Sequence, residues 1–176
     1  HIAFYAGWPN AWGAFRLAKE VYGDDNEAEE HGGFFGMGEP NTAFARYFIG
    51  QGYLKPLTDG SKTVFVANVT FEPGCRNNWH IHHAKKGGGQ LLICVDGEGW
   101  YREEGKPGQS WKPWDVVTIA AEVKHWHGRK SASRLSHLAV DVTRQGTSTD
   151  WLEAVSDDAY GGTGNCRHSQ GKIRSA

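Results

Sequence analysis

The stretch GCRNNWHIHHAKKGGGQLLICVDG, residues 74–97, decides the fold. It contains two histidines two residues apart, His80 and His82, in a segment that reads as a β-strand. Because alternate side chains of a strand point to the same face, these two imidazoles point together, whereas His83 points to the opposite face. Gln90 opens a second strand after the loop AKKGGG. Two imidazoles arranged in this way can bind a single metal ion.

The residues around this stretch predict further short strands. Residues 63–71 are rich in β-branched and aromatic side chains, and Phe65, Ala67, Val69 and Phe71 share one face. The expected strands that follow are Trp79–His82, Gln90–Val95, Gly99–Glu103, Asp115–Ile119, Val123–His127 and Arg134–Val142. Clusters of Gly, Pro, Lys and Asp separate them, and no long helical pattern interrupts the series. This favours antiparallel sheets over βαβ units, so we expect an all-β barrel.

The two ends of the chain differ from this series. Apolar residues recur at helical spacing over His1–Tyr22, and an acidic, then Gly-rich stretch follows to residue 44. We therefore expect residues 1–44 to be a helix and linker arm, residues 45–160 the barrel domain, and residues 161–176 a flexible tail. Asp150–Ser156 predicts a short C-terminal helix with Asp150 near its N-cap.

Composition excludes several classes of protein. The 19 basic and 20 acidic side chains leave a net charge of −1, and no basic run stands out, so we expect no nucleic-acid partner. No apolar stretch approaches the roughly 18 residues of a membrane span. The three cysteines, at spacings that match no zinc ribbon or redox pair, indicate reduced thiols in a cytoplasmic protein. Cys75 and Cys94 are interpreted as packing residues.

Histidines gather in the central series, where six of the nine lie between His80 and His137. His125 and His127 repeat the spacing of the first pair on a later strand, and His137 lies on another. A lone histidine is more often an ordinary interior or surface residue. Burying several imidazoles without partners is costly, however, and a shared metal ion satisfies them together.

The same residues resemble the two motifs of the cupin family. Gly74, His80, His82, a ligand position and Gly97 match the first motif, and KPWDVVTIAAEVKHWHG, residues 112–128, is similar to the second, with His125 as its metal-binding histidine. The chain departs from the family in carrying Gln90 for the usual Glu, a longer preceding loop, and Arg129 for the terminal Asn. The resemblance covers about residues 45–155 and implies the cupin double-stranded β-helix, a jelly-roll barrel.

Gln90 and the HWH sequence resemble one branch more closely, the small manganese-dependent cupins that include bacterial hydroxynitrile lyases. This resemblance implies the metal ligands His80, His82, Gln90 and His125. It makes His137 a further pocket histidine and Ala67 and Val69 small residues that line the substrate pocket. It also implies one divalent metal, with Mn(II) the first choice and Fe, Ni, Co or Zn as alternatives, because imidazole-rich sites discriminate poorly among these ions.

Neutral donors leave the full positive charge on such an ion, which favours Lewis-acid chemistry on a small oxygenated substrate, such as a lyase or decarboxylase reaction. His137 is the candidate general base or, as readily, a partner that orients a ligand. His127 ranks below it, and Asp141, on the same face as His137, is a candidate to orient that histidine or to contact substrate. A binding cupin without catalysis remains the alternative, and a dioxygenase is disfavoured by Gln90.

The N-terminal residues HIAFYAGWPNAWGAF, 1–15, resemble the end of a carboxymuconolactone decarboxylase-type helical domain. This resemblance implies that the chain is the C-terminal part of a decarboxylase-like/cupin fusion, without that domain's own activity. The aromatic N-terminal arm indicates exchange between protomers, so we expect a homodimer.

Overall fold

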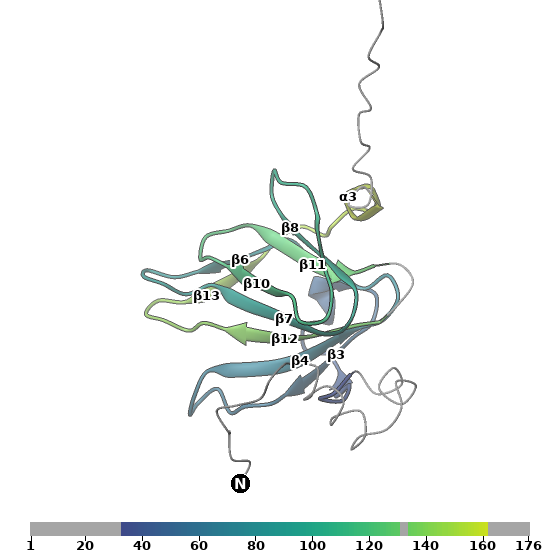
Figure 1. Ribbon diagram of the computed structural model, residues 1–176. Coiled ribbons are helices and arrows are strands. Elements are labelled where there is room, and N and C mark those ends of the chain that lie inside the picture. Colours follow the sequence, from purple (N-terminus) through teal and green to yellow (C-terminus); the bar gives the residue numbers. More distant parts are fainter. Residues whose placement is uncertain (1–32, 131–133, 162–176) are drawn as a thin grey trace, which may run out of the picture.

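The computed structural model describes residues 33–130 and 134–161, and these residues form two β-sheets that face each other (Figure 1). The all-β prediction is confirmed for this part of the chain. The expected N-terminal helix and most of the C-terminal tail lie outside the described residues.

One sheet has six strands in the order β1-β3-β4-β12-β7-β10. Its strands are β1 (Glu39–Pro40), β3 (Gly52–Pro56), β4 (Phe65–Phe71), β12 (Leu135–Asp141), β7 (Gln90–Gly97) and β10 (Val116–Ile119). Strand β12 pairs with β4 on one side and β7 on the other, so that Asp141 lies opposite both Phe65 and Gln90. Strand β1 lies upstream of the expected domain boundary at residue 45.

The second sheet has the order β13-β6-β11-β5-β2, with β8 and β9 attached through β11. Its strands are β13 (Ser148–Trp151), β6 (His80–His83), β11 (His125–Arg129), β5 (Arg76–Asn77), β2 (Phe48–Ile49), β8 (Gly99–Glu103) and β9 (Gln109–Trp111), and a 3₁₀ turn, η1 (Ala45–Tyr47), precedes β2. Strand β11 is the centre of this sheet, since it pairs with β5, β6 and β8.

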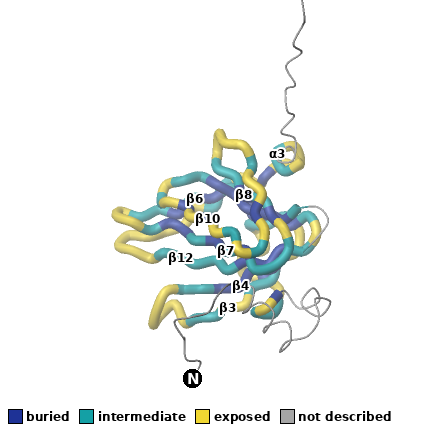
Figure 2. The backbone as a smooth tube through the Cα atoms, viewed as in Figure 1, coloured by how far each residue is buried: buried dark blue, intermediate teal, exposed yellow. Residues whose placement is uncertain are grey.

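The core lies between the two sheets, where buried segments from both gather (Figure 2). Its apolar members are led by Phe71, Leu92, Trp111 and Leu135, each fully buried. Alternation along β4 turns Ala67 and Val69 into the same interior, as the sequence pattern predicts. Cys75 and Cys94 are buried free thiols, and burial raises the pKa of each to about 12, which confirms them as packing residues.

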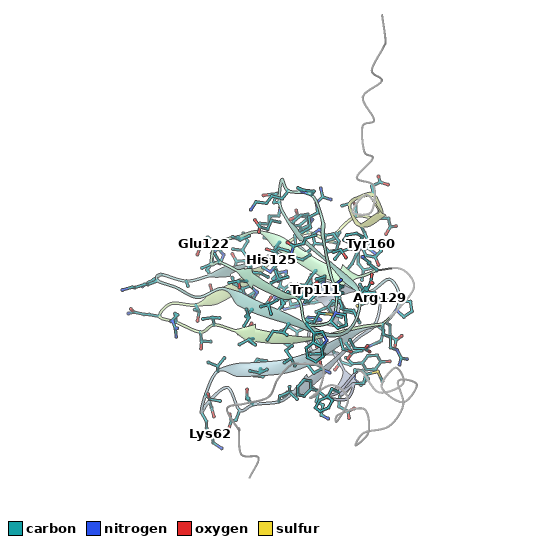
Figure 3. All side chains as sticks on the ribbon, viewed as in Figure 1. Lys62, Trp111, Glu122, His125, Arg129 and Tyr160 are labelled. Carbon is teal, nitrogen blue, oxygen red and sulfur yellow. The ribbon has the colours of Figure 1, made fainter. Side chains whose placement is uncertain are left out.

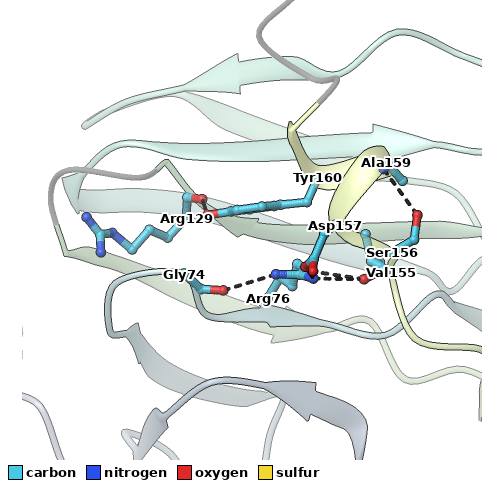
Figure 4. A network of polar contacts seen from close by, with 8 residues as sticks. All are labelled: Gly74, Arg76, Arg129, Val155, Ser156, Asp157, Ala159 and Tyr160. Carbon is cyan, nitrogen blue, oxygen red and sulfur yellow. Dashed lines mark hydrogen bonds and ion pairs between the residues drawn. The ribbon is translucent and has the colours of Figure 1, made fainter.

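The prediction of a short helix over Asp150–Ser156 was wrong. Residues 150 and 151 end strand β13, and the helix α3 spans Asp157–Gly161, where the Ser156 hydroxyl accepts a hydrogen bond from the Ala159 amide at 3.1 Å. Figure 4 shows the polar contacts that attach the segment around α3 to the rest of the barrel. Buried Arg76 donates twice to the Val155 carbonyl, at 3.0 and 3.1 Å, and the Tyr160 hydroxyl donates to the Arg129 carbonyl.

No helix in the described part of the chain has the length and apolar character needed to cross a membrane.

Candidate metal centre

The first pair of histidines lies on β6, whose burial alternates. His80 and His82 are buried, at 1% and 9% exposure, whereas Ile81 and His83 are only half-buried. Strand β11 brings His125 directly opposite His80, and His125 is fully buried as well. Figure 3 labels His125 among the side chains around β11. The alternation predicted from the sequence therefore places three imidazoles in one interior.

These three imidazoles converge. One ligand nitrogen from each lies within 4.8 Å of the others, which is close enough for a shared ion. The ring centroids of His80 and His125 are 4.1 Å apart, and those of His80 and His82 are 5.1 Å apart. Within the described residues, this is the group of His, Cys, Asp or Glu side chains that could hold a metal ion.

The hydrogen bonds of the Nδ1 atoms show that the group fits a metal. The Nδ1 of His80 donates to the Asn78 carbonyl and that of His125 to the Val123 carbonyl, each at 2.9 Å. The Nδ1 of His82 lies 3.0 Å from the Thr149 hydroxyl. A carbonyl oxygen only accepts, so Nδ1 carries the proton in His80 and His125 and Nε2 keeps its lone pair. This is how the outer nitrogen of a metal-binding histidine is usually held.

The Nε2 atoms of His82 and His125 are buried and have no hydrogen-bond partner among the described residues. An orphaned buried nitrogen is costly unless something binds it. Burial is the main cause that lowers the pKa of each of the three rings. The pKa of His80 lies well below its usual value, that of His125 is lowered to about 4, and that of His82 is also lowered. The triad is therefore neutral at physiological pH, as metal binding requires.

Gln90, the fourth ligand implied by the resemblance, opens β7 and is also buried. Its Oε1 is a further buried atom without a hydrogen-bond partner in the described part of the chain, and its Nε2 donates to Asp141 Oδ1 at 3.3 Å. Both Asp141 and Gln90 act on His82 in the direction opposite to burial, because each favours its protonated form. The Gln90 amide thus lies beside the triad, with its buried oxygen next to His82.

His127 and His137 lie deeper in the barrel. The ring centroids of the two are 5.0 Å apart, and Phe71 packs against both. His127 Nε2 is 2.8 Å from the Asn77 amide nitrogen, whereas neither ring nitrogen of His137 has a hydrogen-bond partner among the described residues. Burial lowers the pKa of His137 to about 3.

The small residues of β4 lie beside this deeper pair. Val69 is directly opposite His137, and Ala67 is opposite Ala139 of the same strand β12. Asp141 shares the strand with His137, but its carboxylate pairs with Gln90, so the expectation that it orients the His137 imidazole is not supported by a hydrogen bond.

A pocket of about 180 Å³ opens beside the triad. We call it the mouth pocket. It is lined by His82, His83, Gly89, Asp141, Val142, Thr143, Thr147, Ser148 and Thr149. Hydroxyls and a carboxylate predominate in this lining, while His137 is not part of it.

Sequence reasoning missed β13, which completes the site. Thr149 lies opposite His82 and holds its Nδ1, while Trp151 lies opposite His80 and stacks on its ring at 4.7 Å. The alternation of Thr149 and Trp151 is a strand signal, although it covers only a few residues. His83 stays out of the triad, as expected, and bridges Glu122 and Asp150 at 2.6 and 3.2 Å, although it also lines the mouth pocket.

Comparisons with known proteins add to this geometry. No family model matches the chain. Over 118 residues the chain is 38% identical to a protein named (R)-mandelonitrile lyase from Granulicella tundricola, a match that covers 66% of this chain and 87% of that protein. A cupin-like protein of known structure from Thermotoga maritima is 34% identical, with a TM-score of 0.65, and the match covers 72% of this chain and 93% of that one.

A second Thermotoga maritima structure, described as a predicted oxalate decarboxylase, has a TM-score of 0.50 at 20% identity and covers 60% of this chain and 93% of its own. At this identity the likeness concerns the fold alone.

Proposed function

The chain belongs to the cupin superfamily, and from that premise we propose that it is a metal-dependent lyase that acts on a small oxygenated substrate. The metal ligands in this proposal are His80, His82, His125 and Gln90. The proposal depends on one observation. The Nδ1 atoms of His80 and His125 donate hydrogen bonds to backbone carbonyls, so that their unprotonated Nε2 atoms are available to a shared ion.

The ligand set supports Lewis-acid chemistry. Three neutral imidazoles and a neutral amide leave the charge of a divalent ion intact, so that a bound ion would supply strong polarisation of a substrate oxygen. A Glu in place of Gln90 would cancel part of that charge. Manganese is our proposal for the ion, on the resemblance of the His, His, Gln, His set to manganese-dependent cupins.

The protein's own groups bind the substrate in this proposal. The mouth pocket offers the hydroxyls of Thr143, Thr147 and Ser148 next to His82, which suits a small molecule with hydroxyl or carbonyl groups. The carboxylate of Asp141 in the same lining disfavours anionic substrates by charge repulsion.

His137 is the proposed proton acceptor. Its support is the resemblance, which makes it the further pocket histidine, and the fact that both ring nitrogens lack a hydrogen-bond partner among the described residues. Burial lowers its pKa to about 3, so accepting a proton requires substrate or metal charge beside the ring, and His137 lies outside the lining of the mouth pocket. His127 lies between His137 and the triad, with ring centroids 5.0 Å from His137 and 5.7 Å from His80. We assign His127 the role of supporting this interior, and we assign Ala67 and Val69 the role of leaving room beside His137.

The name of the relative from Granulicella tundricola suggests the first assay. Purified chain loaded with Mn(II) is mixed with (R)-mandelonitrile, and release of benzaldehyde and cyanide is followed, with other cyanohydrins, carbonyl compounds and lactones tested in parallel. We expect turnover that a chelator abolishes and Mn(II) restores. Binding of these compounds without turnover would support the alternative, a cupin that only binds a small molecule, and consumption of oxygen would support a dioxygenase.

Three further parts of the proposal rest on sequence alone. They are a homodimer, a cytoplasmic location, and an origin as the C-terminal part of a fusion with a decarboxylase-like domain. Light scattering on the purified chain tests the first of these.

A further inference from the structure

Gln90 differs chemically from the other proposed ligands. An imidazole with its Nδ1 held presents one nitrogen, but an amide has two ends of similar size, and only its oxygen carries a lone pair for a cation. A glutamine therefore serves as a ligand only if something sets which end faces the metal.

Asp141 is in the position to do this. It lies directly opposite Gln90 in the pairing of β12 with β7, and its Oδ1 is 3.3 Å from Gln90 Nε2. The other end of the amide, Oε1, is buried and has no hydrogen-bond partner in the described residues. The two ends of one amide thus differ in surroundings: the nitrogen faces the Asp141 carboxylate, and the oxygen faces the buried interior beside His82.

We infer that Asp141 is a positioning residue that fixes the orientation of the Gln90 amide and so presents Oε1 to the metal site. An ionised carboxylate only accepts hydrogen bonds, so it attracts the NH₂ group and repels the amide oxygen. A flipped amide would set two oxygens against each other and turn an NH₂ group toward the cation. This inference rests on the proposed metal centre and adds a residue outside the ligand set.

Asp141 could also act in a simpler way, through its charge. It lines the mouth pocket together with His82, and its charge favours the protonated form of His82. A nearby negative charge stabilises a bound cation whichever residue occupies position 90. The two roles differ in one respect: orientation matters only when the ligand is an amide, whereas the charge effect is present with any ligand.

A double-mutant cycle separates the orienting role of Asp141 from the effect of its charge. Mn(II) affinity is measured by titration calorimetry, and the Mn(II) coordination by electron paramagnetic resonance, for the wild type, Asp141→Ala, Gln90→Glu and the double variant. A carboxylate at position 90 ligates through either oxygen and needs no orientation. We expect Asp141→Ala to weaken Mn(II) binding about 10- to 100-fold in the Gln90 background, which is the usual effect of losing a group that orients a ligand.

In the Gln90→Glu background we expect the same Asp141→Ala change to weaken Mn(II) binding much less, because only the charge effect of Asp141 remains to be lost. Asp141→Asn keeps the volume, but its own amide can pair with either end of the Gln90 amide, so it should also weaken Mn(II) binding in the Gln90 background, and it stands in for Asp141→Ala if that variant does not fold. Asp158→Ala, which removes an exposed carboxylate on α3 outside the pocket lining, is the matched control and should bind Mn(II) like the wild type.

Two results would overturn the inference: equal losses of affinity in both backgrounds, which would assign Asp141 a charge role alone, or no loss in the Gln90 background. A folded wild type that binds no Mn(II) would instead overturn the metal centre, and with it this inference, before the cycle begins.

Discussion

His80 and His125 lie directly opposite each other on the antiparallel strands β6 and β11, with ring centroids 4.1 Å apart. Each donates its Nδ1 proton to the backbone carbonyl two residues earlier, Asn78 for one and Val123 for the other. The same local arrangement thus occurs on both strands and leaves both Nε2 atoms available to one ion. The backbone thus sets the orientation of both rings.

Thr149 is expected to support the metal through His82. Its hydroxyl lies 3.0 Å from His82 Nδ1, and Thr149→Val removes this partner at nearly constant volume. We expect Mn(II) affinity to fall about 10- to 100-fold, measured by titration calorimetry. Thr149→Ser keeps the hydroxyl and should bind like the wild type. Equal affinities for the Val and Ser variants would rule out this supporting role.

The metal-free protein should lose stability as the pH falls. Burial lowers the pKa of all five interior histidines, which are His80, His82, His125, His127 and His137. Each stays neutral in the folded state but takes up a proton in the unfolded chain below its ordinary pKa of 6.5. The free energy of unfolding should therefore decrease by up to about 1.4 kcal/mol per pH unit for each of them.

Urea denaturation of the chelator-treated protein at about pH 8, 6.5 and 5 measures this dependence. We expect little change between the two higher values and a steep loss toward the lowest. Added Mn(II) should reduce that loss, since it binds only the neutral rings. A free energy of unfolding that is constant down to the lowest pH would contradict the burial of neutral histidines.

His83 should show the opposite dependence. Its pKa is raised, chiefly by the hydrogen bond to Glu122 and further by Asp150, so its protonated form is favoured in the folded state. The stabilisation is present below the ordinary pKa of 6.5 and is lost as the pH rises through the raised value. His83→Gln should lower the melting temperature slightly at about pH 6 and not at about pH 9. A shift of equal size at both would assign His83 a packing role.

His137→Leu separates catalysis from metal binding. An apolar side chain of similar size replaces a buried imidazole that has no hydrogen-bond partner among the described residues, so we expect no loss of stability. Metal content should be unchanged, whereas turnover of the substrate identified by the assay should fall about 10²- to 10⁴-fold, the usual effect of removing a general base. Full turnover with a normal metal content would mean that the proton is accepted elsewhere.

Much of the site could be predicted from local sequence because strand alternation is a strong rule. The spacing of His80 and His82, and the later position of His125, sufficed to place three imidazoles on interior faces, and the structure brings them together. The same rule turned Ala67 and Val69 inward. The placement of these residues depends on the face of the strand from which each side chain projects, and side chains alternate between the two faces with a period of two residues.

Other features depend on tertiary pairing that local sequence does not contain. Asp150 followed by Glu153 has the spacing of a helix capping box, which favours a helix locally, yet pairing with β6 makes residues 148–151 a strand. Alternation also says nothing of depth. His82 and His137 both point inward, but one lines the mouth pocket and the other packs against Phe71 and Trp111. Strand β12 reaches the pocket only with Asp141, four residues after His137.

The most direct test of the metal centre is the metal content of the protein itself. Chelator-treated chain is incubated with Mn(II), desalted and assayed by elemental analysis, alongside His82→Ala and the control His83→Gln, which removes a neighbouring histidine outside the triad, with folding checked by circular dichroism. We predict a single ion per chain for the wild type and the control and none for His82→Ala. A folded wild type without metal, or a His82→Ala variant that keeps it, would contradict the account.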